Sequence, residues 1–159
     1  MAVERQEAVT APELMFRGAN DSDVPAIMDI ERQSYIFPWT EGIFRDCLRV
    51  NYTCRVVEIS ASIAGYGIMS IAAGEAHLLN LCVGEAWRCR GVGRRLLAHL
   101  LQVAANLGAR ESFLEARPTN TTAIRLYQSL GYVQIGIRRG YYQAVDGRED
   151  AIVLKRRLD

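Results

Sequence analysis

The sequence contains almost no lysine and very little histidine, two side chains on which many catalytic and metal sites depend. Lys155 is the only lysine, and His77 and His99 are the only histidines. A lysine nucleophile beside the glycine-rich segment described below is therefore excluded. Two separated histidines also offer little material for a metal site.

Cysteine is scarce as well, and its spacing fits neither a zinc site nor a disulfide framework. The four cysteines, Cys47, Cys54, Cys82 and Cys89, lie far apart and form no C-x-x-C pair. Zinc sites and disulfide-stabilised secreted domains both show closely patterned cysteines. We therefore expect free, mostly buried thiols and no bound metal.

Long apolar runs and a strong charge bias are also missing. No segment approaches the roughly 18 uninterrupted apolar residues of a membrane span, and residues 1–13 carry charges where a signal peptide would be apolar. The formal net charge of +1 provides no general attraction to nucleic acid or an acidic membrane. These absences predict a cytoplasmic protein with no membrane and no direct nucleic-acid partner. Nucleic-acid binding stays the weakest alternative, because no aromatic residues are interleaved with the basic group Arg138, Arg139, Lys155, Arg156 and Arg157.

The chain does have enough apolar sequence for one folded domain. Half of its 159 residues are hydrophobic and 23% are charged, a balance typical of a globular domain. Residues 1–12 mix charged and small residues without a regular period. We predict a flexible tail over residues 1–12, a single domain over residues 13–159 and, as a working assumption, a monomer.

The most distinctive segment joins a strand, a glycine loop and a helix between residues 78 and 107. An apolar strand ending at Val83 is followed by the run Arg88-Cys89-Arg90-Gly91-Val92-Gly93 and then by an amphipathic helix. Glycines let the backbone turn tightly, and the first turn of a helix presents unpaired N–H groups at its positive end. This arrangement predicts a site for phosphate or pyrophosphate.

The remaining pattern predicts a mixed α/β sheet with helices on both faces. Strands are expected at 14–17, 52–59, 63–72, 76–83, 112–115, 133–139 and 150–158, and helices at 21–35, 40–48, 91–107 and 120–130. Short turns favour an antiparallel meander before residue 83. The strand at 112–115 follows a helix and should lie parallel to the strand ending at Val83. Residues 141–149 are expected to form a loop between the last two antiparallel strands.

Two motifs in this order make the chain resemble the GNAT superfamily of acetyl-CoA-dependent N-acetyltransferases. Arg88-x-x-Gly91-x-Gly93 is similar to the family's pyrophosphate loop, Q/R-x-x-G-x-G/A. The segment from Asn120 to Tyr132 is similar to its N-x-x-A-x-x-L-Y-x-x-x-G-F/Y motif. Segments 37–40, 114–117 and 141–151 further resemble the branch of this family that acetylates the N-terminal alanine of a small-subunit ribosomal protein. The resemblance covers nearly everything after residue 12, and it implies a mostly antiparallel sheet whose central parallel strands splay apart.

The resemblance implies that acetyl-CoA binds in the gap between those two strands. Backbone groups of the first strand would hold the thioester carbonyl and the pantetheine arm, and the glycine loop would wrap the pyrophosphate. The residues so implied are Leu81, Cys82, Val83, Arg88, Cys89, Arg90, Gly91, Val92, Gly93, Arg94 and Asn120. Asn120 would bond the arm or the coenzyme, although its position is explained equally well by a helix N-cap.

Glu115 and Tyr127 are the implied catalytic pair. Glu115 would take the proton of the substrate amine, directly or through a water, and Tyr127 would protonate the departing coenzyme A thiolate. An N-terminal amine, with a pKa of about 8, needs less help than a lysine side chain, at about 10.4. Without the resemblance, Glu115 is an exposed carboxylate near Arg117 and Tyr127 is a core aromatic residue with a satisfied hydroxyl.

The candidate substrate-binding residues are Phe37, Trp39, Glu41, Tyr141 and Tyr142. The aromatic rings would line a groove, and Glu41, with Glu149 or Asp150, would meet a basic side chain of the substrate. The alternatives are a hydrophobic plug between two helices and solvated carboxylates paired with nearby arginines.

The predicted function is transfer of an acetyl group from acetyl-CoA to the N-terminal α-amino group of a protein. The specific expectation, from the resemblance, is the N-terminal alanine of a ribosomal protein. Acetylation of other protein N-termini, lysines or small amines is the enzymatic alternative. The non-enzymatic alternative is a regulatory module that binds acetyl-CoA without catalysis. The presence of both Glu115 and Tyr127 counts against this alternative.

Overall fold

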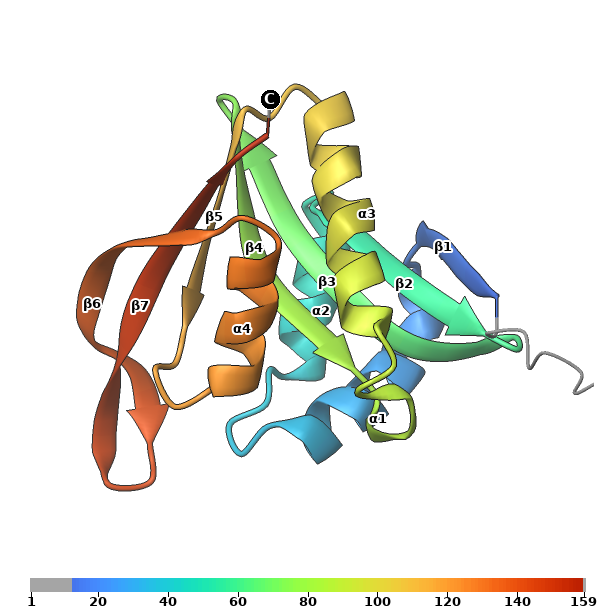
Figure 1. The fold of residues 1–159 in the computed structure, drawn as a ribbon. Helices are drawn as coiled ribbons and strands as arrows, with labels where there is room; N and C mark the ends of the chain where they lie inside the picture. The colour runs from blue at the N-terminus through green and yellow to red at the C-terminus, as the bar shows by residue number, and fades with distance from the viewer. Residues whose placement is uncertain (1–12, 159) are drawn as a thin grey trace, which may run out of the picture.

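The computed structural model describes residues 13–158, and within that range the chain forms one seven-stranded sheet and four α-helices (Figure 1). The strands are β1 (Leu14–Gly18), β2 (Thr53–Ile59), β3 (Ser62–Ala72), β4 (Glu75–Val83), β5 (Glu111–Ala116), β6 (Val133–Ala144) and β7 (Gly147–Arg157). The helices are α1 (Val24–Ser34), α2 (Glu41–Arg49), α3 (Val92–Asn106) and α4 (Thr121–Ser129). The tail predicted for residues 1–12 lies outside the described residues.

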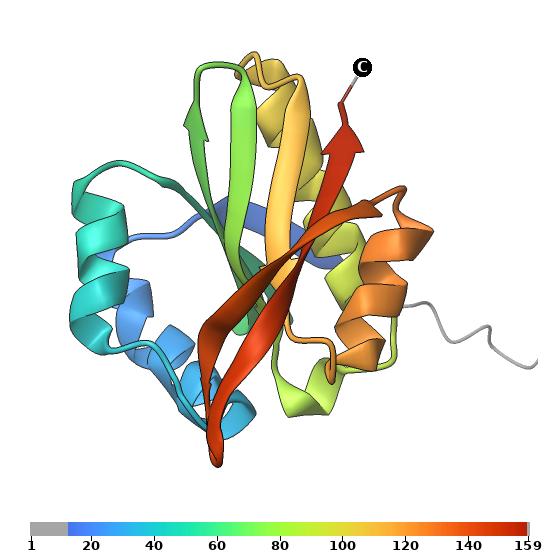
Figure 2. The ribbon, with the colours of Figure 1, turned by 90° about the vertical axis from the view of Figure 1, so that its left-hand side faces the viewer.

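The sheet has the mixed topology expected from the sequence. Its strand order is β1-β2-β3-β4-β5-β7-β6, and each neighbouring pair is antiparallel except β4 and β5. Figure 2 shows α1 and α2 on one side of the sheet and α3 and α4 on the other. The prediction of a mostly antiparallel sheet with one parallel central pair and helices on both faces is confirmed.

The two parallel strands pair only along their first halves. Their register ends at Leu78 opposite Leu114, after which β4 keeps β3 as its partner and β5 keeps β7. The register between β3 and β4 also shifts here, leaving Leu79 as an extra residue on β4. Such a bulge bends a strand. The strands therefore separate toward their carboxyl ends (Figure 1), and in the described structure no strand covers the side of residues 79–83 that faces β5.

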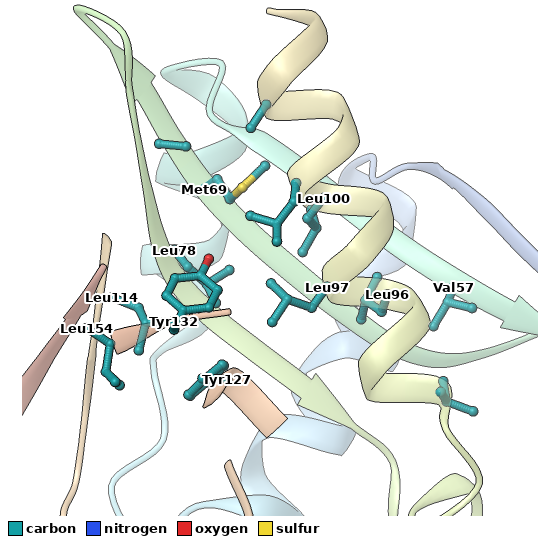
Figure 3. Packing of buried hydrophobic residues seen from close by; sticks show 14 of the residues in the cluster. Val57, Met69, Leu78, Leu96, Leu97, Leu100, Leu114, Tyr127, Tyr132 and Leu154 are labelled. Carbon is teal, nitrogen blue, oxygen red and sulfur yellow. The ribbon is translucent and has the colours of Figure 1, made fainter. Parts of the chain in front are cut away.

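The helix α3 packs its apolar side on the sheet and on the aromatic rings of α4 and the segment after it. Figure 3 shows this contact through Leu96, Leu97, Leu100, Tyr127 and Tyr132. The residues of α3 that take part recur at helical spacing, which puts them on one side. A Cβ at Gly67 of β3 would lie 2.3 Å from Cδ1 of Leu100. Helix and sheet can approach this closely because position 67 has no side chain.

A second apolar cluster covers the opposite face of the sheet. It joins α1 and α2 to β2 and β3 through Val24, Ile27, Phe44, Val56 and Tyr66. The four cysteines are free; Cys47, Cys54 and Cys82 are buried, while Cys89 is exposed. The expectation of mostly buried thiols is confirmed.

The β6–β7 hairpin is longer than predicted. β6 continues to Ala144 and β7 begins at Gly147, so the prediction of a loop over residues 141–149 was wrong. Pairing shifts between Arg138 and Tyr142, and Gly140 within this stretch has a φ of 60°. This irregularity interrupts the alternation of side chains by which a strand is recognised in a sequence.

Candidate active site

A cleft of about 560 Å³ opens between β4, the glycine loop and α4. Ten of the eleven residues predicted to hold the cofactor line it: Leu81, Cys82, Val83, Arg88, Cys89, Gly91, Val92, Gly93, Arg94 and Asn120. Arg90 does not, and its guanidinium lies 5.6 Å from the centre of the Trp87 ring. Ser34 and Tyr35, at the end of α1, also line the cleft although no sequence motif singled them out. Their contribution depends on the packing of α1 against the sheet, which sequence spacing does not reveal.

Two residues of the glycine loop adopt the left-handed backbone conformation before α3 begins. Cys89 has a φ of 60°, and Gly91, the N-cap residue of α3, has a φ of 78°. No side chain caps this helix end in the described structure. The N–H groups of the first turn of α3 are therefore left for water or an anion.

Two arginines, one before the glycines and one in the first turn of α3, hold the cleft walls together. Arg88 donates hydrogen bonds to the backbone oxygen of Val83 at 3.0 Å and to Oγ of Ser34 at 2.8 Å. Arg94 donates to Oγ of Ser129 at 2.6 Å, which ties the first turn of α3 to the end of α4. These side chains therefore shape the loop as well as adding positive charge beside it.

Tyr35 and Asn120 make hydrogen bonds on opposite sides of the cleft, one to β4 and the other at the start of α4. The hydroxyl of Tyr35 donates a hydrogen bond of 3.1 Å to the backbone oxygen of Leu81. The side chain of Asn120 accepts a hydrogen bond of 3.2 Å from the N–H of Ala123 and so caps α4. Asn120 thus lies in the cleft and serves as the N-cap at the same time.

Glu115 lies near the end of β5 with its side chain only 7% exposed. One carboxylate oxygen is 2.5 Å from Nε2 of His77, and the other is 3.4 Å from Nε of Arg138. Burial acts to raise the pKa of Glu115, but the hydrogen bond with His77 and the electrostatic effects of His77 and Arg138 outweigh it. The pKa therefore lies below its ordinary value, and the carboxyl group is ionised at neutral pH.

His77 is a neighbour of Glu115 that the sequence motifs did not indicate. In the parallel register His77 is opposite Phe113, and Glu115 is two residues further along β5. Side chains two residues apart lie on the same face of a strand, so this register brings His77 and Glu115 together. The pairing of β4 with β5 was predicted, but its register was not.

Tyr127 lies in α4 and lines the cleft while remaining only 9% exposed. Its ring packs edge to face on Tyr132, with ring centres 5.9 Å apart. Its hydroxyl makes no hydrogen bond with another residue in the range 13–158. Burial raises the pKa of Tyr127, so the hydroxyl keeps its proton at neutral pH.

The two candidate catalytic residues belong to opposite faces of the sheet. Leu114 and Ala116 of β5 pack in the same cluster as Tyr127. Because side chains alternate along a strand, Glu115 points to the other face, on the side of α1 and α2. The separation of β4 from β5 leaves a gap in the sheet between these two environments.

A hollow of about 310 Å³ next to the α1–α2 connection includes Phe37, Arg117 and Glu149. The guanidinium of Arg117 lies 4.4 Å from the centre of the Tyr142 ring and 5.9 Å from that of Phe37. It also forms an ion pair of 3.1 Å with Glu149. Arg117 thus joins the hairpin to the α1–α2 connection.

The other candidate substrate residues have different surroundings. Trp39 is partly buried and packs on Phe44, with ring centres 5.2 Å apart. Glu41 pairs with Arg45 at 2.8 Å, and Asp150 accepts a hydrogen bond of 2.8 Å from the N–H of Gly140. Tyr141 is 43% exposed at the edge of the sheet.

Residues 13–158 contain no helix with the length and apolar character that crossing a membrane requires. Over the same range, no three His, Cys, Asp or Glu side chains gather closely enough to hold a metal ion.

Comparison with known proteins identifies close relatives of this chain. A model of the acetyltransferase (GNAT) family matches residues 24–132. The ribosomal protein bS18-alanine N-acetyltransferase of Escherichia coli K12 is 37% identical over 133 residues, which cover 84% of this chain and 90% of that protein. The crystal structure of the E. coli ribosomal-protein-S18-alanine N-acetyltransferase aligns with a TM-score of 0.87 and 33% identity, over 92% of this chain and 95% of that one. The structure of Ard1 from Thermoplasma volcanium aligns with a TM-score of 0.82 and 25% identity, over 91% and 97% of the two chains.

Proposed function

Since the chain belongs to the acetyltransferase (GNAT) family, we propose that it transfers an acetyl group from acetyl-CoA to the N-terminal alanine of a small-subunit ribosomal protein of the bS18 type. The observation that carries this proposal is the gap between β4 and β5, with Glu115 on one face of the sheet and Tyr127 on the other. The specific substrate rests on the relatives, which are named for that reaction.

The cleft is suited to acetyl-CoA. The uncovered side of β4 would receive the pantetheine arm like an added strand, and the open end of α3 would receive the pyrophosphate. Leu81, Cys82 and Val83 would supply the backbone N–H that holds the thioester carbonyl. The other cleft residues of the glycine loop, together with Asn120, would enclose the remainder of the coenzyme.

Glu115 is proposed as the base. Its pKa is lowered, so it carries a charge at neutral pH and can draw a proton from an ammonium group, directly or through a water. An N-terminal amine, with a pKa of about 8, is a better match for this carboxylate than a lysine side chain, at about 10.4.

Tyr127 is proposed as the acid. Its raised pKa keeps the O–H intact until the coenzyme A thiolate departs, and the hydroxyl then donates its proton to the sulfur. Tyr127 lines the same cleft as Cys82 and Val83 of β4, where the thioester would lie, and this supports the role.

Phe37, Tyr141 and Tyr142 are proposed to contact the first residues of the substrate on the Glu115 face. Trp39 would support this surface from behind, because it packs on the core. The carboxylates of Glu41, Glu149 and Asp150 each have a partner already. A basic second residue of the substrate would therefore have to compete with Arg45 or Arg117 for them.

The test is a panel assay with acetyl-CoA and mass spectrometry of the products. The panel contains peptides with N-terminal alanine followed by a basic residue, the same peptides with blocked N-termini, lysine peptides and polyamines. We expect acetylation of the free N-terminal alanine and none of the blocked peptide. Acetylation of lysine or polyamines alone would contradict the proposal, and coenzyme binding without product on any amine would favour a regulatory module.

A further inference from the structure

His77 contacts the proposed base at hydrogen-bond distance from a more exposed position. Its Nε2 lies 2.5 Å from Oε2 of Glu115. The His77 side chain is 35% exposed, whereas that of Glu115 is 7% exposed. Of the two groups, the imidazole is the one that an incoming amine or a water can reach more readily.

The hydrogen bond also defines which ring nitrogen is available. An ionised carboxylate only accepts hydrogen bonds, so the Nε2 atom of His77 must carry the proton that it shares with Glu115. In the neutral imidazole, Nδ1 then has a lone pair and can accept a proton. Within residues 13–158, Nδ1 makes no hydrogen bond.

We infer that His77 is a catalytic residue: its Nδ1 takes the proton of the substrate amine while Glu115 orients the ring through Nε2–H and stabilises the positive charge that forms. This inference rests on the proposed function and specifies how Glu115 acts in it. One N–H bond of the ammonium group breaks and one N–H bond forms at Nδ1. The exposed ring then returns the proton to water, and the neutral tautomer is restored.

The surroundings of His77 are consistent with this cycle. The carboxylate of Glu115 on β5 faces His77 through Oε2. Its other oxygen, Oε1, is paired with Arg138 of β6, and Tyr142 of β6 lies near the same carboxylate. On β3 the residue opposite His77 is Ser70, which is uncharged. The acidic residue of α1 that reaches β4, Glu31, bonds to Asn80 instead. Glu115 is thus the acidic group that faces a positive charge formed at position 77, and Arg138 contacts the far oxygen of that carboxylate.

The test replaces the imidazole and then supplies it from solution. In His77→Ala, with Glu115 intact, we expect kcat/KM for the alanine peptide to fall about 10- to 100-fold and to recover in part with added imidazole. In His77→Gln the side-chain amide can still donate to Glu115 but cannot take the proton, so we expect a similar loss with a wild-type melting temperature. The matched control is His99→Ala, because His99 stacks on Phe16 with ring centres 4.5 Å apart, away from the cleft. We expect this control to keep its activity and to show no response to imidazole.

A double variant provides a second readout. If Glu115 acts through His77, combining His77→Ala with Glu115→Gln should reduce kcat/KM no further than the worse single change. Wild-type kcat/KM in either His77 variant, or a loss that imidazole leaves unchanged, would overturn the inference. Failure of the proposed function would be seen separately, as a wild-type protein that acetylates no peptide.

Discussion

Tyr127 and Tyr132 belong to the same aromatic contact, but their hydroxyl groups have different surroundings. The Tyr132 hydroxyl shares a hydrogen bond of 2.6 Å with Oγ of Ser112, whereas Tyr127 is one of the residues that line the cleft. Removal of the Tyr127 hydroxyl should leave the packed ring in place and remove only the proton donor. We expect Tyr127→Phe to lower kcat about 100-fold or more, with little change in KM for acetyl-CoA or in melting temperature. Steady-state kinetics and thermal denaturation measure this.

Tyr132→Phe is the control for that experiment. It leaves Ser112 without its buried partner, so we expect a loss of about 1–3 kcal/mol in the free energy of unfolding with kcat preserved. A Tyr127→Phe protein with the kcat of the wild type would remove Tyr127 from the mechanism.

Glu115 should determine how the reaction depends on pH. Its lowered pKa keeps it ionised throughout the neutral range, so we expect the wild type to deprotonate the amine without alkaline conditions. Without this carboxylate His77 loses the group that orients it, so the amine, with a pKa of about 8, depends more on the solution to lose its proton. We expect the deficit in kcat/KM of Glu115→Gln to be largest near pH 7 and to shrink as the pH rises to about 9.5.

The control for this pH series is Glu111→Gln on the same strand, where Glu111 pairs with Lys155 at 2.9 Å outside the cleft. We expect it to follow the wild-type profile. A deficit in Glu115→Gln that is constant across the pH range would argue against a role in deprotonation.

At the scale of elements, the entry into α3 depends on a left-handed residue at position 91. Alanine there would be strained by roughly 1–2 kcal/mol, and relaxation of the loop would move the N–H groups that are proposed to bind the pyrophosphate. We expect Gly91→Ala to raise the Kd for coenzyme A about tenfold, which corresponds to about 1.4 kcal/mol. Isothermal titration calorimetry measures this Kd. Gly42→Ala within α2 is the control, because its φ is not positive, and an unchanged Kd in Gly91→Ala would contradict the role given to the loop.

A second prediction concerns the contact between β1 and the start of α1. Arg17 donates hydrogen bonds of 2.8 and 2.7 Å to the two carboxylate oxygens of buried Asp23. These bonds lower the pKa of Asp23 despite the opposing effect of burial, and the N–H of Asn20 adds to them. Since the folded-state pKa is lowered, the stabilisation is present above the unfolded pKa of about 3.9 and is lost as the pH falls through the folded value.

We therefore expect Asp23→Asn to lower the free energy of unfolding by about 1–3 kcal/mol at pH 7, and the difference from the wild type to shrink as the pH falls below about 5. Urea denaturation at several pH values measures this. Asp46→Asn, which removes an exposed ion pair with Arg49, should change the stability by less than about 1 kcal/mol at any pH. A difference for Asp23→Asn that does not depend on pH would contradict the ionic explanation.

At the scale of the whole molecule, the coenzyme should stabilise the fold, because the cleft joins α1, β4, α3 and α4. A ligand that binds only the folded state adds about 2.7 kcal/mol at 100 times its Kd. For a chain of this size we expect coenzyme A to raise the melting temperature by roughly 5–10 °C at that concentration. Differential scanning calorimetry measures the shift, and ATP at the same concentration is the control. No shift with coenzyme A would contradict binding at the cleft.

Much of the fold could be predicted from the sequence, because it depends on residues that are neighbours in the chain. The strand, glycine loop and helix around Gly91 follow from residues that are neighbours in the chain, and a crossover helix makes parallel pairing of the flanking strands the expected topology. The two motifs from Arg88 to Gly93 and from Asn120 to Tyr132 indicated the family for the same reason. The antiparallel pairing of β6 and β7 was predicted, but the part of this hairpin in residues 141–149 was missed, because an irregular stretch around Gly140 hides the strand period.

The sequence by itself determined the secondary elements of the centre of the sheet, the glycine loop before α3 and the family. Only the tertiary structure decided which side chains meet at the site. His77 and Glu115 are 38 positions apart, and their contact depends on the register of β4 with β5. The hydrogen bond between Tyr35 and Leu81 likewise depends on how α1 packs on the sheet. Register and helix packing arise from the summed burial of many distant side chains, so no short stretch of sequence encodes them.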